Sequence, residues 1–201
     1  MFSGKSGAMF IQIEDTPNPQ TLKFLPGQVV VDSETYDFSS PAGAEKSPLA
    51  LRLFEIEGVQ RVFFGHDFIS VTKDVAQDWY ALKPLVLGAL LEHFVAKRPI
   101  IDTQKTIEHD AEQSDASLSQ EDQAIVGEII ELLDSRIRPA VAMDGGDITF
   151  VKFEGGTVYL ALKGACSGCP SSTATLKQGI ESMLQFYIPE VKSVEAMNTE
   201  Q

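Results

Sequence analysis

The alternation of apolar and polar residues predicts two short strands close to the N-terminus. Residues 10–13 alternate as in a half-buried strand, and the run Thr16-Pro-Asn-Pro19 then forces a turn. A second strand is expected over residues 21–25, and Pro26-Gly27 ends it. These two segments predict the beginning of a sheet.

The next apolar patterns predict a helix, a hairpin and a second helix. Ser47-Pro48 is typical of a helix start, with Ser as the N-cap and Pro at the first helical position. Residues 59–64 and 68–72 are expected to form a hairpin. Helical spacing then begins at Pro84. Residues 9–101 are therefore predicted to form one compact α+β domain.

Two segments lack the pattern of a folded element. Residues 102–118 are rich in Asp and Glu and poor in aliphatic residues, so they cannot bury enough apolar surface to offset their ordering entropy. We expect a flexible acidic linker there. Residues 1–8 lack the apolar core of a signal peptide, and a second plausible start follows at Met9. We interpret them as a cloning remnant or an alternative start.

The remaining residues, 119–201, predict a second α+β domain. Ser119-Gln-Glu-Asp122 resembles a capping box at the start of a helix that Pro139 ends. Met143-Asp-Gly-Gly-Asp147 is expected to be a turn. The predicted order is α-β-β-α-β, with elements near 125–137, 148–153, 158–162, 176–184 and 191–196. The fold class is thus α+β, with two small domains and a Cys-x-x-Cys loop in the second.

Composition and charge exclude several classes of protein. The chain has 201 residues, of which 43% are hydrophobic and 22% are charged, as in a soluble globular protein. A net charge of −13 argues against nucleic acid as a partner, because phosphate backbones are held by clustered Lys and Arg. No apolar run approaches the roughly 18–20 residues that span a bilayer, so no membrane partner is expected.

The only two cysteines, Cys166 and Cys169, form a Cys-x-x-Cys pair. This number is too small for a secreted disulfide framework and favours a reducing compartment. An iron–sulfur cluster or a tetrahedral zinc needs about four ligands, so one chain supplies half a site. A second copy, another protein or an exogenous ligand must complete the site, unless the pair performs redox chemistry alone.

The surroundings of the pair favour thiolate chemistry. Cys169-Pro170 is expected to begin a helix, whose unpaired N–H groups and positive dipole end stabilise sulfur anions. Gly164 and Gly168 let the loop bend around a bulky ligand, and their N–H groups are candidate donors to sulfides.

Other interpretations weigh less. An inert thiol pair is disfavoured by the neighbouring glycines, and a thioredoxin-like pair is expected in a βαβ unit rather than after an antiparallel hairpin. His66, His93 and His109 are predicted to be packing or solvated histidines. Neither a nucleotide-binding loop nor a nucleophile elbow occurs, so nothing in the sequence argues for an enzyme.

Several motif blocks closely resemble the NifU-like C-terminal domain. They lie within residues 120–197 and occur in the family's order, at residues 143–148, 158–162, 164–172 and 175–181. The first domain resembles the Nfu-type N-terminal domain at residues 16–24 and 79–84. Together they make the chain similar to Nfu-type iron–sulfur proteins of bacteria and mitochondria.

The resemblance implies a carrier or scaffold of a [4Fe-4S] cluster. It implies that Cys166 and Cys169 bind the metal and that the cluster bridges the two subunits of a homodimer. It further implies transfer to client apoproteins, with the N-terminal domain recognising clients or assembly factors. The expected compartment is a bacterial cytoplasm, with the mitochondrial matrix as the alternative.

Overall fold

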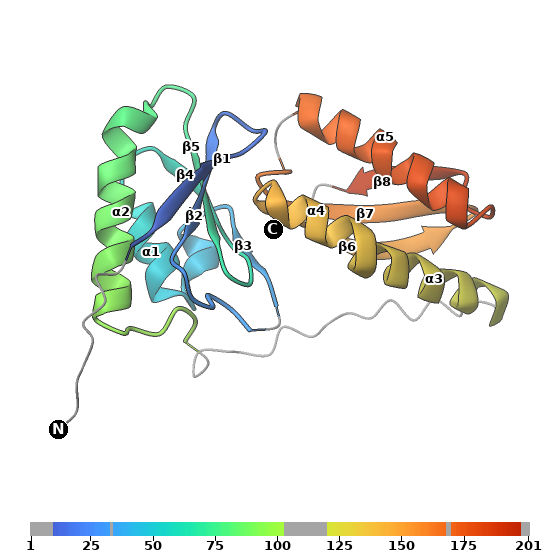
Figure 1. Cartoon of the computed structure of the whole chain (residues 1–201), viewed down its shortest axis with the longest axis horizontal. Coiled ribbons are helices and arrows are strands. Elements are labelled where there is room, and N and C mark those ends of the chain that lie inside the picture. Colours follow the sequence, from blue (N-terminus) through green and yellow to red (C-terminus); the bar gives the residue numbers. More distant parts are fainter. Residues whose placement is uncertain (1–9, 33, 103–119, 168–169, 198–201) are drawn as a thin grey trace.

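The computed structural model describes residues 10–32, 34–102, 120–167 and 170–197. They form two α+β domains, each with its own sheet, as the sequence predicts (Figure 1). Residues 1–8 and nearly all of the predicted linker lie outside the described residues. Asp102 is described, and its N–H donates to the carbonyl of Lys46 at 2.7 Å.

The N-terminal domain contains a five-stranded sheet in the order β1-β2-β5-β4-β3. Every neighbouring pair of strands is antiparallel. The sheet is accompanied by a short 3-10 helix and two α-helices. The elements are β1 Gln12–Asp15, β2 Thr21–Leu25, β3 Tyr36–Phe38, η1 Ala42–Ala44, α1 Pro48–Phe54, β4 Val59–Phe64, β5 Ile69–Lys73 and α2 Trp79–Val95.

The strand alternation divides this sheet into two chemically different faces. One face carries the apolar side chains that pack with α1 and α2, among them Leu22, Phe24, Val62, Phe64, Ile69 and Val71. The intervening residues point the other way, because successive side chains of a strand lie on opposite faces. They include Lys23, Asp37, Arg61, Phe63 and Ser70. We call this second set the docking face, because it contacts the C-terminal domain.

The two helices of the N-terminal domain begin at capped residues. Ser47 precedes α1 as predicted, and its Oγ accepts from the N–H of Ala50 at 3.1 Å. The prediction that the second helix begins at Pro84 is wrong, because α2 starts at Trp79. Asp78 provides the earlier start by accepting from the N–H of Tyr80 at 2.9 Å. Pro84 lies inside the helix and removes one internal hydrogen bond.

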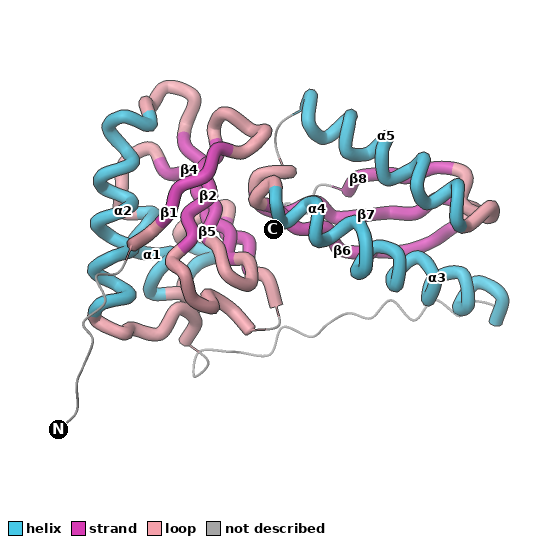
Figure 2. The backbone as a smooth tube through the Cα atoms, in the orientation of Figure 1, coloured by secondary structure: helices cyan, strands magenta, loops and turns pink. Residues whose placement is uncertain are grey.

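The C-terminal domain packs its helices on one side of a three-stranded sheet (Figure 2). The sheet order is β6-β7-β8, with β6 and β7 antiparallel and β7 and β8 parallel. The elements are α3 Gln120–Leu132, the π-helical turn η3 Leu133–Ile137, α4 Arg138–Met143, β6 Gly146–Glu154, β7 Thr157–Gly164, α5 Pro170–Tyr187 and β8 Ser193–Met197.

Pro139 does not end the first helix of this domain, contrary to the sequence prediction. The chain widens into the π-helical turn η3 and continues as α4 to Met143, with Pro139 among the first residues of α4. The wider hydrogen bonding of the π-helical turn, in which the N–H of Arg138 donates to the carbonyl of Leu133, accommodates the proline within a continuous helix. The extension brings the end of α4 to the turn before β6.

None of the described helices has both the length and the apolar character that crossing a lipid bilayer requires.

We expect Ser47→Ala to lower the free energy of unfolding of the N-terminal domain by about 1–2 kcal/mol, because the substitution removes a helix N-cap. Ser47 is fully buried and also donates to the carbonyl of Ile100 at 2.7 Å. Urea unfolding followed by Trp79 fluorescence measures the change, since Trp79 is the only tryptophan of the chain. The exposed Ser182→Ala serves as the control, and an equal loss in that variant would contradict the capping role.

Candidate functional site

Cys166 lies in the loop between the end of β7 and the start of α5, as the sequence predicts. β7 ends at Gly164 and α5 begins at Pro170. Cys169 lies outside the described residues. The described part of the loop therefore consists of Ala165, Cys166 and Ser167.

Glycines shape the backbone around Cys166. Gly145 adopts a φ of +80° in the turn after α4, and Gly164 adopts a φ of +64° at the end of β7. Gly146 pairs with Gly164 across the sheet. A Cβ on Gly146 would lie 2.8 Å from the Sγ of Cys166, a separation that real Cβ atoms do not reach. The turn predicted over residues 143–147 is shorter in the structure, because Met143 ends α4 and β6 begins at Gly146. Gly146, the first residue of β6, packs directly against Cys166.

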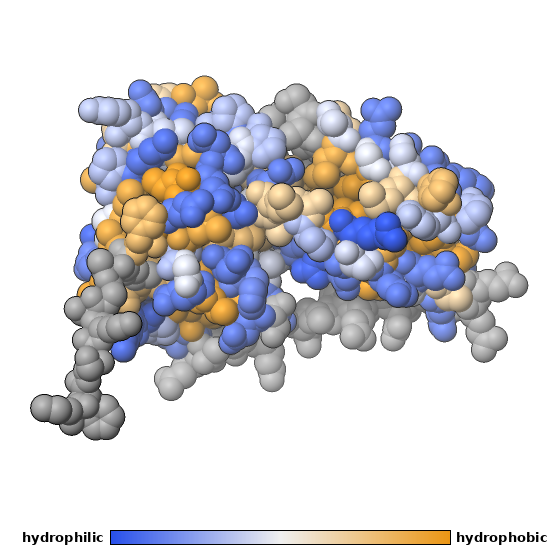
Figure 3. All heavy atoms as spheres, viewed as in Figure 1, coloured by the Kyte–Doolittle hydropathy of each residue, from blue (hydrophilic) through white to orange (hydrophobic). Residues whose placement is uncertain are grey.

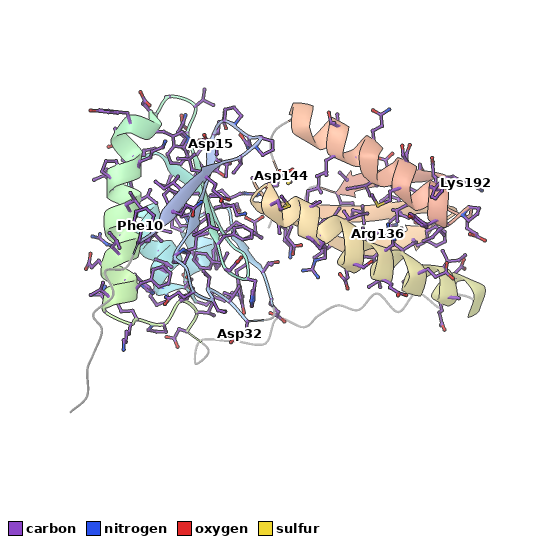
Figure 4. The ribbon with its side chains drawn as sticks, viewed as in Figure 1. Phe10, Asp15, Asp32, Arg136, Asp144 and Lys192 are labelled. Carbon is purple, nitrogen blue, oxygen red and sulfur yellow. The ribbon has the colours of Figure 1, made fainter. Side chains whose placement is uncertain are left out.

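Burial makes the Cys166 thiol a poor nucleophile in this structure. The residue is 6% exposed. Its burial, together with the nearby carboxylates of Asp144 and Asp147, raises the pKa of the Cys166 thiol to about 12. Asp144 lies at the end of the C-terminal domain that faces the five-stranded sheet (Figure 4). The stabilising effect expected from the start of the following helix is thus outweighed at Cys166 by desolvation.

Asp147 is held by an arginine next to the same turn. The guanidinium of Arg138 donates from Nε to Oδ1 and from Nη2 to Oδ2, each at 2.9 Å. Thr35 of the N-terminal domain donates to Oδ2 at 2.8 Å. Burial alone would raise the pKa of Asp147, but the hydrogen bonds from Arg138 and Thr35 outweigh it and lower the pKa.

The N-terminal domain contacts the backbone on both sides of this turn. Lys23 donates to the carbonyl of Met143 at 3.3 Å, and the hydroxyl of Ser70 donates to the carbonyl of Gly145 at 2.6 Å. Polar side chains of the first domain thus bind main-chain acceptors of the second.

Three further side chains of the N-terminal domain contact the cysteine loop itself. Asn18 donates to the carbonyl of Ala165 at 3.3 Å. The carboxylate of Asp37 accepts from the N–H of Gly164 at 3.0 Å. Arg61 donates to the hydroxyl of Ser167 and also pairs with Asp37 at 3.3 Å. The N–H of Gly164, expected as a donor to sulfide, is occupied by Asp37 in this structure.

Asp37 is an ionisable group at a desolvated place. Its burial raises the pKa of Asp37, although Arg61 and the N–H of Gly164 pull the pKa down. This opposes the behaviour of Asp147, whose hydrogen bonds prevail. The surroundings of Asp37 therefore disfavour its charged form, whereas those of Asp147 favour it.

An apolar groove of about 640 Å³ lies between α4 and α5, with Asp144 on its edge. Ile137, Val141, Leu176, Ile180 and Met183 line it. Figure 3 shows apolar atoms on the surface between these helices. The cysteine-bearing domain therefore combines a buried thiol with an accessible apolar surface.

Of the histidines considered from the sequence, His66 lines a cavity of about 260 Å³ together with Arg138, Gly146 and Asp147. Nδ1 of His66 lies 3.0 Å from the carbonyl of Val31 in the N-terminal domain. His93 is 2% exposed on α2, and its burial lowers the pKa of the imidazole. His109 lies outside the described residues. Among the described residues, no group of three or more His, Cys, Asp or Glu could hold a metal ion.

The side chains of Asp37 and Arg61 beside the cysteine loop were not predicted from the sequence. β3, which carries Asp37, was not predicted either. Its signal is the triplet Tyr36-Asp-Phe38, in which two aromatic residues flank a carboxylate. That alternation places the aromatic rings on one face of a strand and the acid on the other.

Comparisons with known proteins match both halves of the chain. A family model described as "Scaffold protein Nfu/NifU N terminal" matches residues 11–97, and one described as "NifU-like domain" matches residues 129–195. The protein named "NFU1 iron-sulfur cluster scaffold homolog, mitochondrial" of Homo sapiens is 52% identical over 188 residues, covering 93% of this chain and 71% of that protein. The chain belongs to the Nfu family.

A second relative agrees with this membership. The Nfu relative of the same name from Drosophila willistoni is 50% identical over 189 residues, which are 93% of this chain and 63% of that protein. The present Nfu chain thus spans between 63% and 71% of the length of these two relatives. The solution NMR structure of a NifU-like protein from Saccharomyces cerevisiae matches 47% of this chain and 86% of its own, with 25% identity and a TM-score of 0.41.

We expect Asp147→Asn to lower the free energy of unfolding by about 1.5–3 kcal/mol at neutral pH, the range for hydrogen bonds to charged groups. The pKa of Asp147 is lowered from 3.8 in the folded chain, so its stabilisation is present above that value. The difference between wild type and variant should shrink as the pH falls through the folded pKa. Urea unfolding followed by far-UV circular dichroism measures it.

The matched control for this prediction is Asp134→Asn. Asp134 contacts the same Arg138 at 3.1 Å, but its side chain is 54% exposed. We expect a small effect, because exposed ion pairs contribute little. Equal losses in the two variants would contradict the special role of the buried carboxylate.

Proposed function

We propose that this chain is an iron–sulfur cluster carrier or scaffold. In this proposal a [4Fe-4S] cluster is bound by Cys166 and Cys169 of two chains and is transferred to client apoproteins. The observation that carries the proposal is the chain's only cysteine pair in an Nfu-family protein, with its described member, Cys166, in a loop packed against Gly146. The human relative's name, which contains "iron-sulfur cluster scaffold", supports it.

The number of ligands supports a shared site. Two cysteines supply two of the about four thiolates that such a cluster needs. The described residues contain no His, Cys, Asp and Glu cluster that would complete a site within one chain. A symmetric second copy provides two more cysteines, so we propose a homodimer that forms through the cluster-binding domains.

A cluster shared between chains is suited to transfer. Neither subunit surrounds it with a closed set of four thiolates, so a client can replace one pair of thiolates at a time. The proposed division of the chain is 9–101 for client or assembly-factor recognition, 102–118 as a linker, and 119–201 for cluster binding. Tethering raises the effective concentration of the cluster domain near a client held by the first domain.

A thiol-disulfide oxidoreductase is the competing function. Its attacking cysteine requires an accessible thiolate of lowered pKa. Cys166 is buried, and its burial raises the pKa of the thiol to about 12. The cysteine loop joins β7 to α5, and β8, which follows α5, lies parallel to β7. The loop therefore does follow the first strand of a βαβ unit, so the sequence argument against an oxidoreductase from the position of the loop is wrong. Metal binding also requires a thiolate, so the burial of Cys166 does not separate the two functions. The family membership and the name of the human relative favour the carrier.

The names of the relatives bear on the compartment. Those from Homo sapiens and Drosophila willistoni are named mitochondrial. They support the mitochondrial matrix over the bacterial cytoplasm as the place where this chain works.

Anaerobic reconstitution with iron and sulfide tests the proposed function. We expect four irons per dimer and loss of the bound iron in Cys166→Ala and Cys169→Ala, because each variant removes a ligand from both subunits. Iron analysis, visible absorption and native mass measurement give the result. Ser182→Ala, on the exposed side of α5, should load fully. A wild-type monomer without iron would refute the proposal, and strong insulin reduction would favour the oxidoreductase.

A further inference from the structure

The docking face of the N-terminal sheet fits the cysteine loop with specific contacts. Asn18 donates to the carbonyl of Ala165, immediately before Cys166. Arg61 donates to the hydroxyl of Ser167, immediately after it. The N-terminal domain therefore binds the residues on both sides of the proposed cluster ligand.

An aromatic side chain completes this contact. Phe63 is fully buried, although it is absent from the apolar cluster between the sheet and α1 and α2. A Cβ on Gly164 would lie 2.8 Å from the ring of Phe63, so the ring packs directly against the glycine backbone. Phe68 of the same domain also packs against Phe63, with ring centroids 5.8 Å apart, and the docked C-terminal domain covers the side of the ring that faces Gly164.

We propose that the docking face is a binding surface for the chain's own cysteine loop in the cluster-free protein, and that cluster loading vacates it. The second half rests on the proposed function. A bridging cluster requires the cysteine loop of another subunit to face Cys166. In the docked arrangement Asn18, Asp37 and Arg61 hold the residues around it. The docking face and the cysteine loop of the other subunit therefore compete for the same cysteine loop.

The contact has the chemistry of a reversible interface. Lys23, Ser70 and Asn18 bind main-chain carbonyls, which water can bind after separation. Within the described residues, the buried Oδ1 of Asp37 has no hydrogen-bond partner. Opening returns that carboxylate oxygen to water, which offsets part of the lost contacts. Polar contacts of this kind are typical of domain interfaces that separate.

Hydroxyl-radical footprinting of the full chain tests the docking, because it measures the solvent access of individual side chains. Phe24, on the helix-covered face of the same sheet and fully buried, is the internal reference. We expect Phe63 in the cluster-free wild type to be as protected as Phe24. Oxidation of Phe63 without oxidation of Phe24 in the cluster-free wild type would overturn the proposal.

Two substitutions should separate the domains. Ser70→Glu places a carboxylate against the carbonyl of Gly145, and Arg61→Ala removes the contact with Ser167 without adding bulk. We expect oxidation of Phe63 to increase in both variants while Phe24 stays protected. A protected Phe63 in both variants would contradict docking through these contacts.

Matched controls carry the same chemical changes away from the docking face. Ser182→Glu lies on the exposed side of α5, and Arg52→Ala removes an exposed ion pair with Glu55 on the outer side of the N-terminal domain. In both control variants we expect the same oxidation of Phe63 and Phe24 as in the wild type. Unfolding followed by Trp79 fluorescence identifies a variant whose N-terminal domain is disrupted. If Ser70→Glu fails to fold, the oxidation of Phe63 in Arg61→Ala alone tests the docking.

The loaded wild type tests the second half of the proposal. We expect Phe63 to become oxidised once four irons per dimer are bound. A loaded dimer in which Phe63 stays as protected as Phe24 would overturn the competition while leaving the proposed function intact. A chain that binds no iron would instead refute the proposed function. The oxidation of Phe63 in the cluster-free wild type and variants would then still test whether the domains dock.

Discussion

The pairing of Gly146 with Gly164 across β6 and β7 is the contact on which the rest of the structure depends. It brings the turn after α4 and the cysteine loop together at one end of the C-terminal sheet. Neither position tolerates a side chain, because a Cβ would meet Cys166 at the first and Phe63 at the second. The same close approach buries the thiol and offers main-chain groups to the other domain. The Gly146–Gly164 pair therefore sets both the backbone path around Cys166 and the surface that contacts the N-terminal domain.

Much of the fold could be predicted because apolar periodicity is strong in this chain. The strand at residues 21–25 matches the structure, and so does the capped start at Ser47. The prediction errors occur where a helix tolerates a proline that the sequence analysis took as the start or end of that helix. Asp78 starts α2 ahead of Pro84, and the π-helical turn lets the chain continue past Pro139. A proline ends a helix only where the missing N–H and the ring cannot be accommodated, and that depends on the neighbouring turns.

The candidate site could be predicted only as far as it is local in sequence. The cysteine spacing and the glycine-rich turn are visible in the chain, and the structure places Cys166 and Gly145 where the sequence suggests. Asp37 is 127 residues away from Gly164 along the chain, so no spacing rule connects the two. The burial that raises the pKa of Cys166 also depends on tertiary packing. A sequence pattern alone would predict an activated thiol there.

Three of the contacts between the domains are hydrogen bonds to main-chain carbonyls, so they depend on the path of the backbone more than on side-chain identity. Lys23, Ser70 and Asn18 bind the carbonyls of Met143, Gly145 and Ala165, and every residue type carries a carbonyl. The exposed side chain at position 143 can therefore change without loss of the hydrogen bond from Lys23, whereas Ala165 is buried and has less freedom. The glycines that set the path of the backbone have no such freedom. The fit between the two domains thus depends on a few backbone conformations. Domains exchanged among related proteins should dock if those conformations are preserved.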